Sequence, residues 1–121
     1  MRDETKRGLL VVLSLVAGVA FVQAKRAAPQ AVEPVVIGSV RYSAPPTPEL
    51  MGFVVATDVA SGKELWRQRI YNVSIKPSLE KDVQWVFITS LRQQGDALLI
   101  RNERGEHFTF DLATRKVTKH K

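Results

Sequence analysis

The amino-acid sequence predicts a small all-β domain, an antiparallel meander of about six or seven strands, behind an apolar N-terminal signal helix. Residues 107–112 alternate apolar and polar side chains, the pattern of a strand with one buried and one solvated face. Glycine-containing turns at residues 94–96 and 103–106 enclose a further expected strand, 97–103, as in strands that follow one another in a meander. These observations fix the fold class, and the elements follow in chain order.

Residues 1–24 have the pattern of a secretory signal, with three basic side chains in the first seven residues and then an apolar stretch over residues 8–22. Val22 and Ala24 are small residues at the positions that a signal peptidase reads, which predicts cleavage before Lys25. The alternative is an uncleaved anchor, but about 15 helical residues span only about 22 Å of a hydrocarbon core about 30 Å thick. We therefore expect a periplasmic or secreted protein, or else one anchored in the membrane and facing the periplasm.

The composition excludes several classes of site. The chain has no cysteine, so disulfides, thiolate zinc sites, a cysteine nucleophile and a lipid-bearing cysteine are all absent. Its formal net charge of +6 is a modest basic excess of the kind that usually keeps a protein soluble. An exported location argues against nucleic acid as the partner.

The mature part begins with a tether and a first strand. Residues 25–34 are rich in alanine and proline and predict a flexible tether, so the β domain is placed at 35–121. Residues 35–42 are dense in β-branched side chains and predict one strand, which the prolines of 44–48 end because proline cannot donate a ladder hydrogen bond.

Residues 52–59 and 64–73 predict a β-hairpin around a tight turn. The Asp58 carboxylate can accept backbone N–H bonds in the turn, and Gly62 can take the positive φ that a compact reversal needs. Ser61 lies between them in the turn, and Trp66 opens the returning strand.

This hairpin carries a family resemblance. The run Ala-x-Asp-x-x-Ser-Gly-x-x-x-Trp over residues 56–66 resembles the tryptophan-docking repeat of pyrroloquinoline-quinone-type β-propellers, with Ser61 where threonine is commoner. The resemblance implies blade-like hairpins and a docking role for Trp66. About 97 residues after the signal (121 − 24) hold roughly two blades, whereas propellers close with about 4–8. Nothing outside the motif matches a quinone site, so no cofactor is expected.

The second half continues the meander. Residues 76–82 predict a loop or one helical turn, and 83–91, the most apolar run after the signal, predicts a central strand buried on both faces. Strands at 97–103 and 107–112 follow. Residues 111–116 echo residues 58–63 at a spacing of 53, either as a true repeat or as common turn chemistry. Residues 115–121 form a basic tail whose end is expected to fray.

Catalytic and metal-binding constellations are not evident. His107 and His120 are the only histidines and lack evident partners, no cluster has a recognised metal-ligand spacing, and the carboxylates of Glu103, Glu106 and their like lie in expected turns. We therefore expect no enzyme activity, no metal and no catalytic residue. The docking candidates are Trp66 and a basic patch with an aromatic side chain, made of Arg67, Arg69 and Tyr71.

The sequence thus predicts an exported, non-catalytic β-sheet interaction module of a bacterial cell envelope, with another envelope protein as its partner. Two alternatives stay open. One is an accessory component of a periplasmic quinoprotein-type redox system, and the other is a binder of anionic envelope polymers. The membrane would be contacted only through an uncleaved N-terminal segment, and the oligomeric state is left open.

Overall fold

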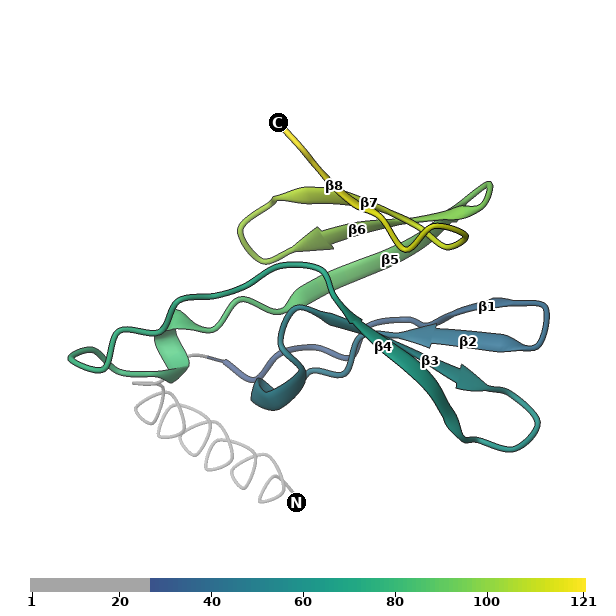
Figure 1. Cartoon of the computed structure of the whole chain (residues 1–121). Helices are drawn as coiled ribbons and strands as arrows, with labels where there is room; N and C mark the ends of the chain where they lie inside the picture. The colour runs from purple at the N-terminus through teal and green to yellow at the C-terminus, as the bar shows by residue number, and fades with distance from the viewer. Residues whose placement is uncertain (1–26) are drawn as a thin grey trace, which may run out of the picture.

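A computed structural model describes residues 27–121 and confirms the all-β, antiparallel fold (Figure 1). The expected signal at 1–24 and the cleavage before Lys25 lie outside the described residues. The strands form two four-stranded sheets, each a simple meander in which consecutive strands pair. The first sheet contains β1 (Val35–Ile37), β2 (Val40–Ser43), β3 (Phe53–Asp58) and β4 (Glu64–Arg69). The second contains β5 (Ile88–Gln94), β6 (Ala97–Asn102), β7 (His107–Asp111) and β8 (Val117–His120).

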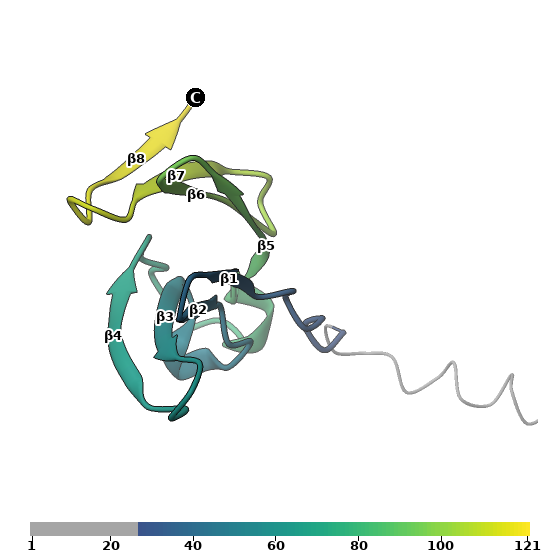
Figure 2. The ribbon, with the colours of Figure 1, turned by 90° about the vertical axis from the view of Figure 1, so that its right-hand side faces the viewer.

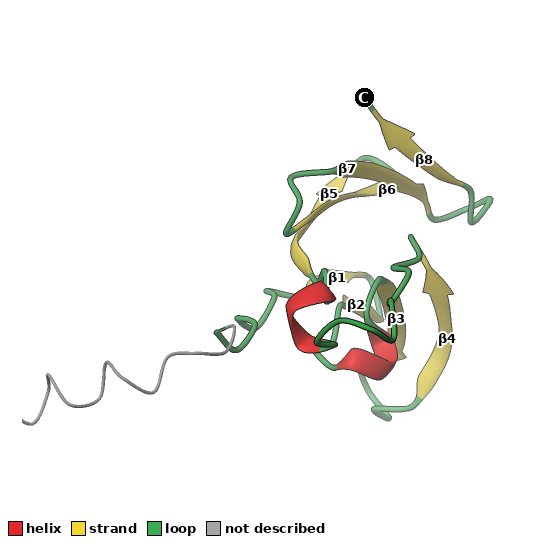
Figure 3. Ribbon diagram, turned by 90° about the vertical axis from the view of Figure 1, so that its left-hand side faces the viewer, coloured by secondary structure: helices red, strands yellow, loops and turns green. Residues whose placement is uncertain are grey.

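The two sheets stack face to face on one hydrophobic core. Figures 2 and 3 show the β1–β4 sheet beneath the β5–β8 sheet, and β1 contacts β5. Val54, Ala56, Leu98 and Phe110 are 0% exposed at the centre of this interface. Because burying a large apolar side chain contributes about 1.5–3 kcal/mol, the contact between the sheets is the main source of stability. Val32, in the 27–34 segment that has no regular secondary structure, also packs against this core.

The strand expected at 35–42 is two strands. Gly38 adopts φ +63 and turns β1 directly into β2, with Val36 paired to Arg41. A two-residue hairpin turn requires positive φ. The turn was not predicted because β-branched residues on both sides of Gly38 gave the pattern of one continuous strand. The basic tail also forms a strand, since β8 pairs with β7 from Phe110–Val117 to His107–His120. These two differences raise the strand count to eight.

The prediction of a central strand at 83–91 is wrong. Residues 82–84 form a short 3-10 helix, η3 (Asp82–Gln84), and β5 begins only at Ile88 and lies at the edge of its sheet. The run is nevertheless buried, with Val86, Phe87 and Ile88 each at most 5% exposed. The apolar residues of this run are buried because they lie in the connection between the sheets. Hydrophobic periodicity alone could not distinguish such a buried connection from a central strand.

A glycine lies at the open end of the β3–β4 hairpin. A second 3-10 helix, η2 (Pro48–Leu50), leads into Gly52, which has φ +81 and accepts a hydrogen bond from the Ile70 N–H at 2.6 Å. A Cβ on Gly52 would lie 2.5 Å from the carbonyl oxygen of Tyr71. Both the dihedral angle and the close approach therefore require glycine here.

The turns after β3 and β7 share one hydrogen-bond pattern. The Gly62 N–H donates to the Asp58 carbonyl at 2.8 Å, and the Arg115 N–H donates to the Asp111 carbonyl at 2.8 Å. Gly62 has φ +75 and Arg115 has φ +65, so the arginine takes the conformation of the glycine. In both turns the aspartate side chain also accepts from the residue three positions later, Ser61 or Thr114.

Strand pairing extends this correspondence across the sheets. Tyr42 pairs with Ala56 as Leu99 pairs with Thr109, and Val40 pairs with Asp58 as Ala97 pairs with Asp111. Positions in β2 and β6 are thus related by 57 residues and positions in β3 and β7 by 53. The sheets are two copies of one blade-like unit.

Candidate functional site

Trp66 lies between the two sheets. Its ring centroid is 5.9 Å from that of Tyr42 in its own sheet and 5.9 Å from that of Phe110 in the other. Arg115 belongs to the turn that follows β7, and its guanidinium carbon lies 3.7 Å from the ring centroid of Trp66. The indole therefore joins the first hairpin to the second sheet and its turn, and it is only partly exposed.

The three other docking candidates do not gather around Trp66. Arg67 and Arg69 are exposed, and Arg67 donates to the Glu64 carboxylate at 2.8 Å while Arg69 donates to Asn72 and lies over the Phe53 ring. The bond to Arg67 lowers the pKa of the Glu64 carboxyl. These arginines belong to the outer face of the first sheet, the face turned away from the core.

Tyr71 points to the interior instead. Its hydroxyl donates to the Val86 carbonyl at 2.6 Å, and its ring stacks on Phe108 with centroids 5.3 Å apart. Burial raises the pKa of the Tyr71 phenol. Tyr71 therefore links the connection between the sheets, through Val86, to the core, through Phe108.

The turn residues have structural roles. The Ser61 N–H donates to the Asp58 carboxylate at 2.8 Å, and the Lys63 N–H donates to the Ser61 hydroxyl at 3.2 Å. The Ser61 N–H lowers the pKa of Asp58 because it stabilises the ionised carboxylate. With Gly62 at positive φ, the motif shapes the hairpin.

A second surface emerges only from the pairing of the strands. On the outer face of the β5–β8 sheet, Ser90 pairs with Arg101, Arg101 with His107, and His107 with His120, so one row crosses all four strands. Beside it, Arg92 pairs with Leu99, which pairs with Thr109. We call these two rows, together with Lys121, the cationic face.

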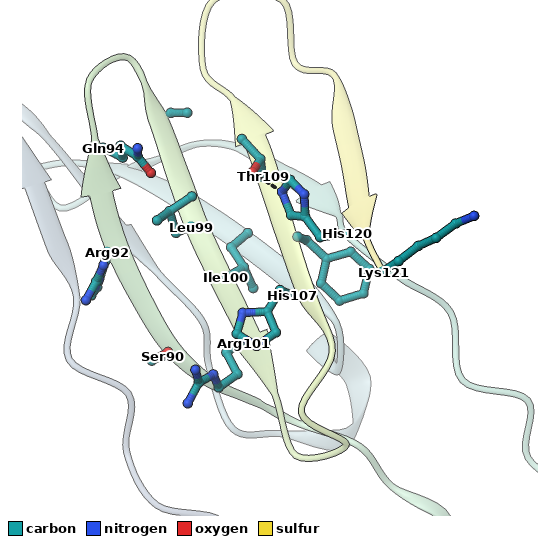
Figure 4. A pocket seen from close by; sticks show the side chains of 12 residues that line it. Ser90, Arg92, Gln94, Leu99, Ile100, Arg101, His107, Thr109, His120 and Lys121 are labelled. Carbon is teal, nitrogen blue, oxygen red and sulfur yellow. Dashed lines mark hydrogen bonds between the residues drawn. The ribbon is translucent and has the colours of Figure 1, made fainter.

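The cationic face surrounds an open hollow of about 900 Å³ (Figure 4). Arg92, Arg101, His107 and His120 line it from four different strands, and no aspartate or glutamate is among the residues that line it. The His120 ring forms a hydrogen bond with the Thr109 hydroxyl. An anion entering the hollow therefore meets cationic and hydrogen-bond-donating side chains with no carboxylate to repel it.

The carboxylates at the two ends of β7 are hydrogen-bonded to other groups. Glu106, which precedes His107, accepts from the Asn102 amide at 2.9 Å and from Lys119 at 2.9 Å. Both bonds lower the pKa of the Glu106 carboxyl, and the bond from Asn102 has the larger effect. Asp111 accepts two N–H bonds of its own turn.

The cationic face occupies the positions of the second sheet that correspond to the contact face of the first. The face of the first sheet that packs on the second carries Val35, Ile37, Val40, Tyr42, Ala44, Val54, Ala56 and Trp66, all of which belong to the core or pack against it. By strand pairing, the corresponding positions of the second sheet are Arg92, Gln94, Ala97, Leu99, Arg101, His107, Thr109 and Thr118. An apolar contact in the first unit is thus mostly polar and basic in the second.

Comparisons with known proteins support the fold. No family model and no curated protein sequence matches the chain. The chain resembles a β-propeller. Thirteen solved chains match its structure, and among them is BamB from Moraxella catarrhalis, with a TM-score of 0.54 and 15% sequence identity. The match covers 78% of this chain and 28% of that one, so the chain spans little more than a quarter of the BamB length.

Sequence reasoning missed the cationic face because its members are far apart in the chain. The available signal was the alternation in 107–112, which placed His107 on the solvated face, together with the glycine turns that set the pairing of β6 with β7. His120 was hidden because the tail was not recognised as a strand. In the described residues, 27–121, no group of three or more histidine or acidic side chains could hold a metal ion. Neither 3-10 helix in that part of the chain has the length and hydrophobicity that a membrane crossing requires.

Proposed function

We propose that this protein is a two-blade, non-catalytic binding module of the bacterial cell envelope, whose partner is another envelope protein. The observation that carries the proposal is the use of the apolar residues. The docking tryptophan and the core join the two sheets, while both outer sheet faces are left open and carry charged and hydrogen-bonding side chains beside apolar ones such as Leu65 and Leu99.

The ionisable side chains favour binding over catalysis. Asp58 and Asp111 hold their own turns, Glu106 is paired with Asn102 and Lys119, and Glu103 accepts a hydrogen bond from the Phe87 N–H at 3.0 Å. Each of these carboxylates is thus engaged in a hydrogen bond within the fold. A general acid or base would have to face a second reactive group across a cleft.

The location rests on the N-terminal sequence. A basic start followed by an apolar stretch is the pattern of exported proteins, and its export would place the two-blade body outside the cytoplasm. A small domain with open sheet faces and free outer strands at β4 and β8 suits attachment to a larger assembly.

The proposal is tested by photo-crosslinking in the native host. The full chain would carry p-benzoylphenylalanine at Leu65, which is 50% exposed on the outer face of β4, or at Leu99 on the cationic face. Leu79, which is 55% exposed in the connection between the sheets, is the matched control. We expect one discrete adduct with an envelope protein from at least one outer face and none from Leu79. Adducts that are absent at both faces, or equal at all three positions, would reject the proposal.

A further inference from the structure

We infer that the cationic face binds an acidic, extended polypeptide segment of the partner, an inference that rests on the proposed function. Its structural basis is the row Ser90, Arg101, His107 and His120, in which each of the four strands of the second sheet contributes one side chain.

The face is more than a polar cap. A terminal unit in a stack of repeats needs a polar outer surface for solubility, and mixed charges meet that need. Here the replaced positions include the charged Arg92 and Arg101 and the hydrogen-bonding His107 but no carboxylate, and Lys121 adds a further positive charge beyond β8. A surface of one sign attracts a partner of the opposite sign and speeds its association.

The apolar floor favours a polypeptide over a phosphate polymer. Leu99 and Ala97 are only partly buried within the hollow, between the cationic side chains. The methylene groups of glutamate side chains can cover such a floor, whereas phosphate groups cannot.

The spacing fits carboxylates on alternate residues. Neighbouring strands lie about 4.8 Å apart, so a row across four strands spans about 14 Å. An extended segment presents side chains to one side about every 6.6 Å. Two or three carboxylates would therefore lie along the row, within reach of Arg101 and the two histidines.

A second copy of the chain does not fit the face. The outer face of the first sheet, which such a copy would present in continuing the stack, carries Arg41, Arg67 and Arg69, and the Glu64 carboxylate is already bonded to Arg67. Packing the two outer faces together would oppose like charges.

The test measures binding of fluorescein-labelled poly-L-glutamate to the full chain by anisotropy at low salt. The variant Arg101→Glu reverses a charge in the middle of the row, and Arg41→Glu, exposed on the outer face of the first sheet, is the matched control with the same change in net charge. We expect Arg101→Glu to weaken binding by roughly tenfold or more and Arg41→Glu by less than about threefold, because screened charges act mainly at short range. Circular dichroism checks that both variants remain folded.

Three outcomes would overturn the inference: no binding of poly-L-glutamate, equal losses for the two variants, or tighter Arg101-dependent binding of polyphosphate or of phosphatidylglycerol vesicles. The first of these leaves the proposed function standing if Leu65 or Leu99 still crosslinks to an envelope protein. If poly-L-glutamate binds but crosslinking finds no envelope protein, the face is correct and the proposed function is wrong.

Discussion

Replacing Trp66 by alanine should loosen the two sheets from each other. Truncating a fully buried tryptophan costs about 3–5 kcal/mol, and Trp66 is partly buried, so its transfer contribution falls at the low end of that range. This low-end figure already includes the ring contacts with Tyr42 and Phe110, worth about 0.5–1.5 kcal/mol each, and the Arg115 guanidinium, worth about 0.5–1 kcal/mol. We expect a total loss of about 3 kcal/mol in the free energy of unfolding.

Urea unfolding of the full chain, followed by far-ultraviolet circular dichroism, measures this loss. With a slope of about 1.5 kcal/mol per molar, the midpoint should fall by about 2 M. Leu65→Ala, next in sequence and 50% exposed on the outer face, is the control and should change the free energy by less than about 1 kcal/mol.

A double-mutant cycle isolates the contact between the sheets. Trp66→Ala and Arg115→Ala should show a coupling energy of about 0.5–1 kcal/mol, because the guanidinium lies directly over the indole. A loss below about 1 kcal/mol for Trp66→Ala, or purely additive effects of the two changes, would refute the docking of the first hairpin on the second sheet.

Three further outcomes are expected from the same unfolding assay. Phe110→Ala should cost about 3–5 kcal/mol and Thr109→Ala less than about 1, since Phe110 is 0% exposed and Thr109 faces the hollow; similar losses would contradict the one-sided burial of β7. Gly52→Ala should cost at least about 2 kcal/mol, because the Cβ would strain the backbone at φ +81 and meet a carbonyl oxygen at 2.5 Å; a neutral effect would show that the connection can move aside. The Thr114 N–H lowers the pKa of Asp111, so its ionised form stabilises the fold above the unfolded pKa of about 3.9 and this contribution is lost as the pH falls through the lower folded value. Asp111→Asn should therefore destabilise the protein more at pH 7 than at pH 2.5, and a pH-independent effect would contradict the role of the charge.

Local patterns were enough to predict several elements. The alternation in 107–112 identified β7 and its buried Phe108 and Phe110. The Asp58 and Gly62 signals identified the hairpin turn, because that chemistry operates within six residues. These features depend on neighbours in sequence, which is why sequence alone sufficed.

Features set by distant contacts were not predictable in this way. Val86, Phe87 and Ile88 are buried by packing between the sheets, so their hydrophobicity could not reveal that β5 starts late and lies at an edge. Arg115 takes a left-handed conformation where the first turn has glycine, and its stacking on Trp66 is a long-range compensation that no local rule contains.

The cationic face shows the same limit for function. Its side chains come from residues 90–121, and they meet because the turns at Gly95 and Gly105 set the pairing of three strands and the tail supplies the fourth. Taken alone, each of its polar side chains has the pattern of an ordinary solvated surface residue. Only the row across the sheet gives them a common target.

Amide chemical-shift mapping tests the central claim most directly. The ¹⁵N-labelled full chain would be titrated with poly-L-glutamate, and perturbed residues would be mapped onto the two outer faces. The account predicts changes concentrated at Arg92, Arg101, His107 and His120, with Arg41 unaffected. Perturbations spread equally over both outer faces, or confined to the first sheet, would contradict it.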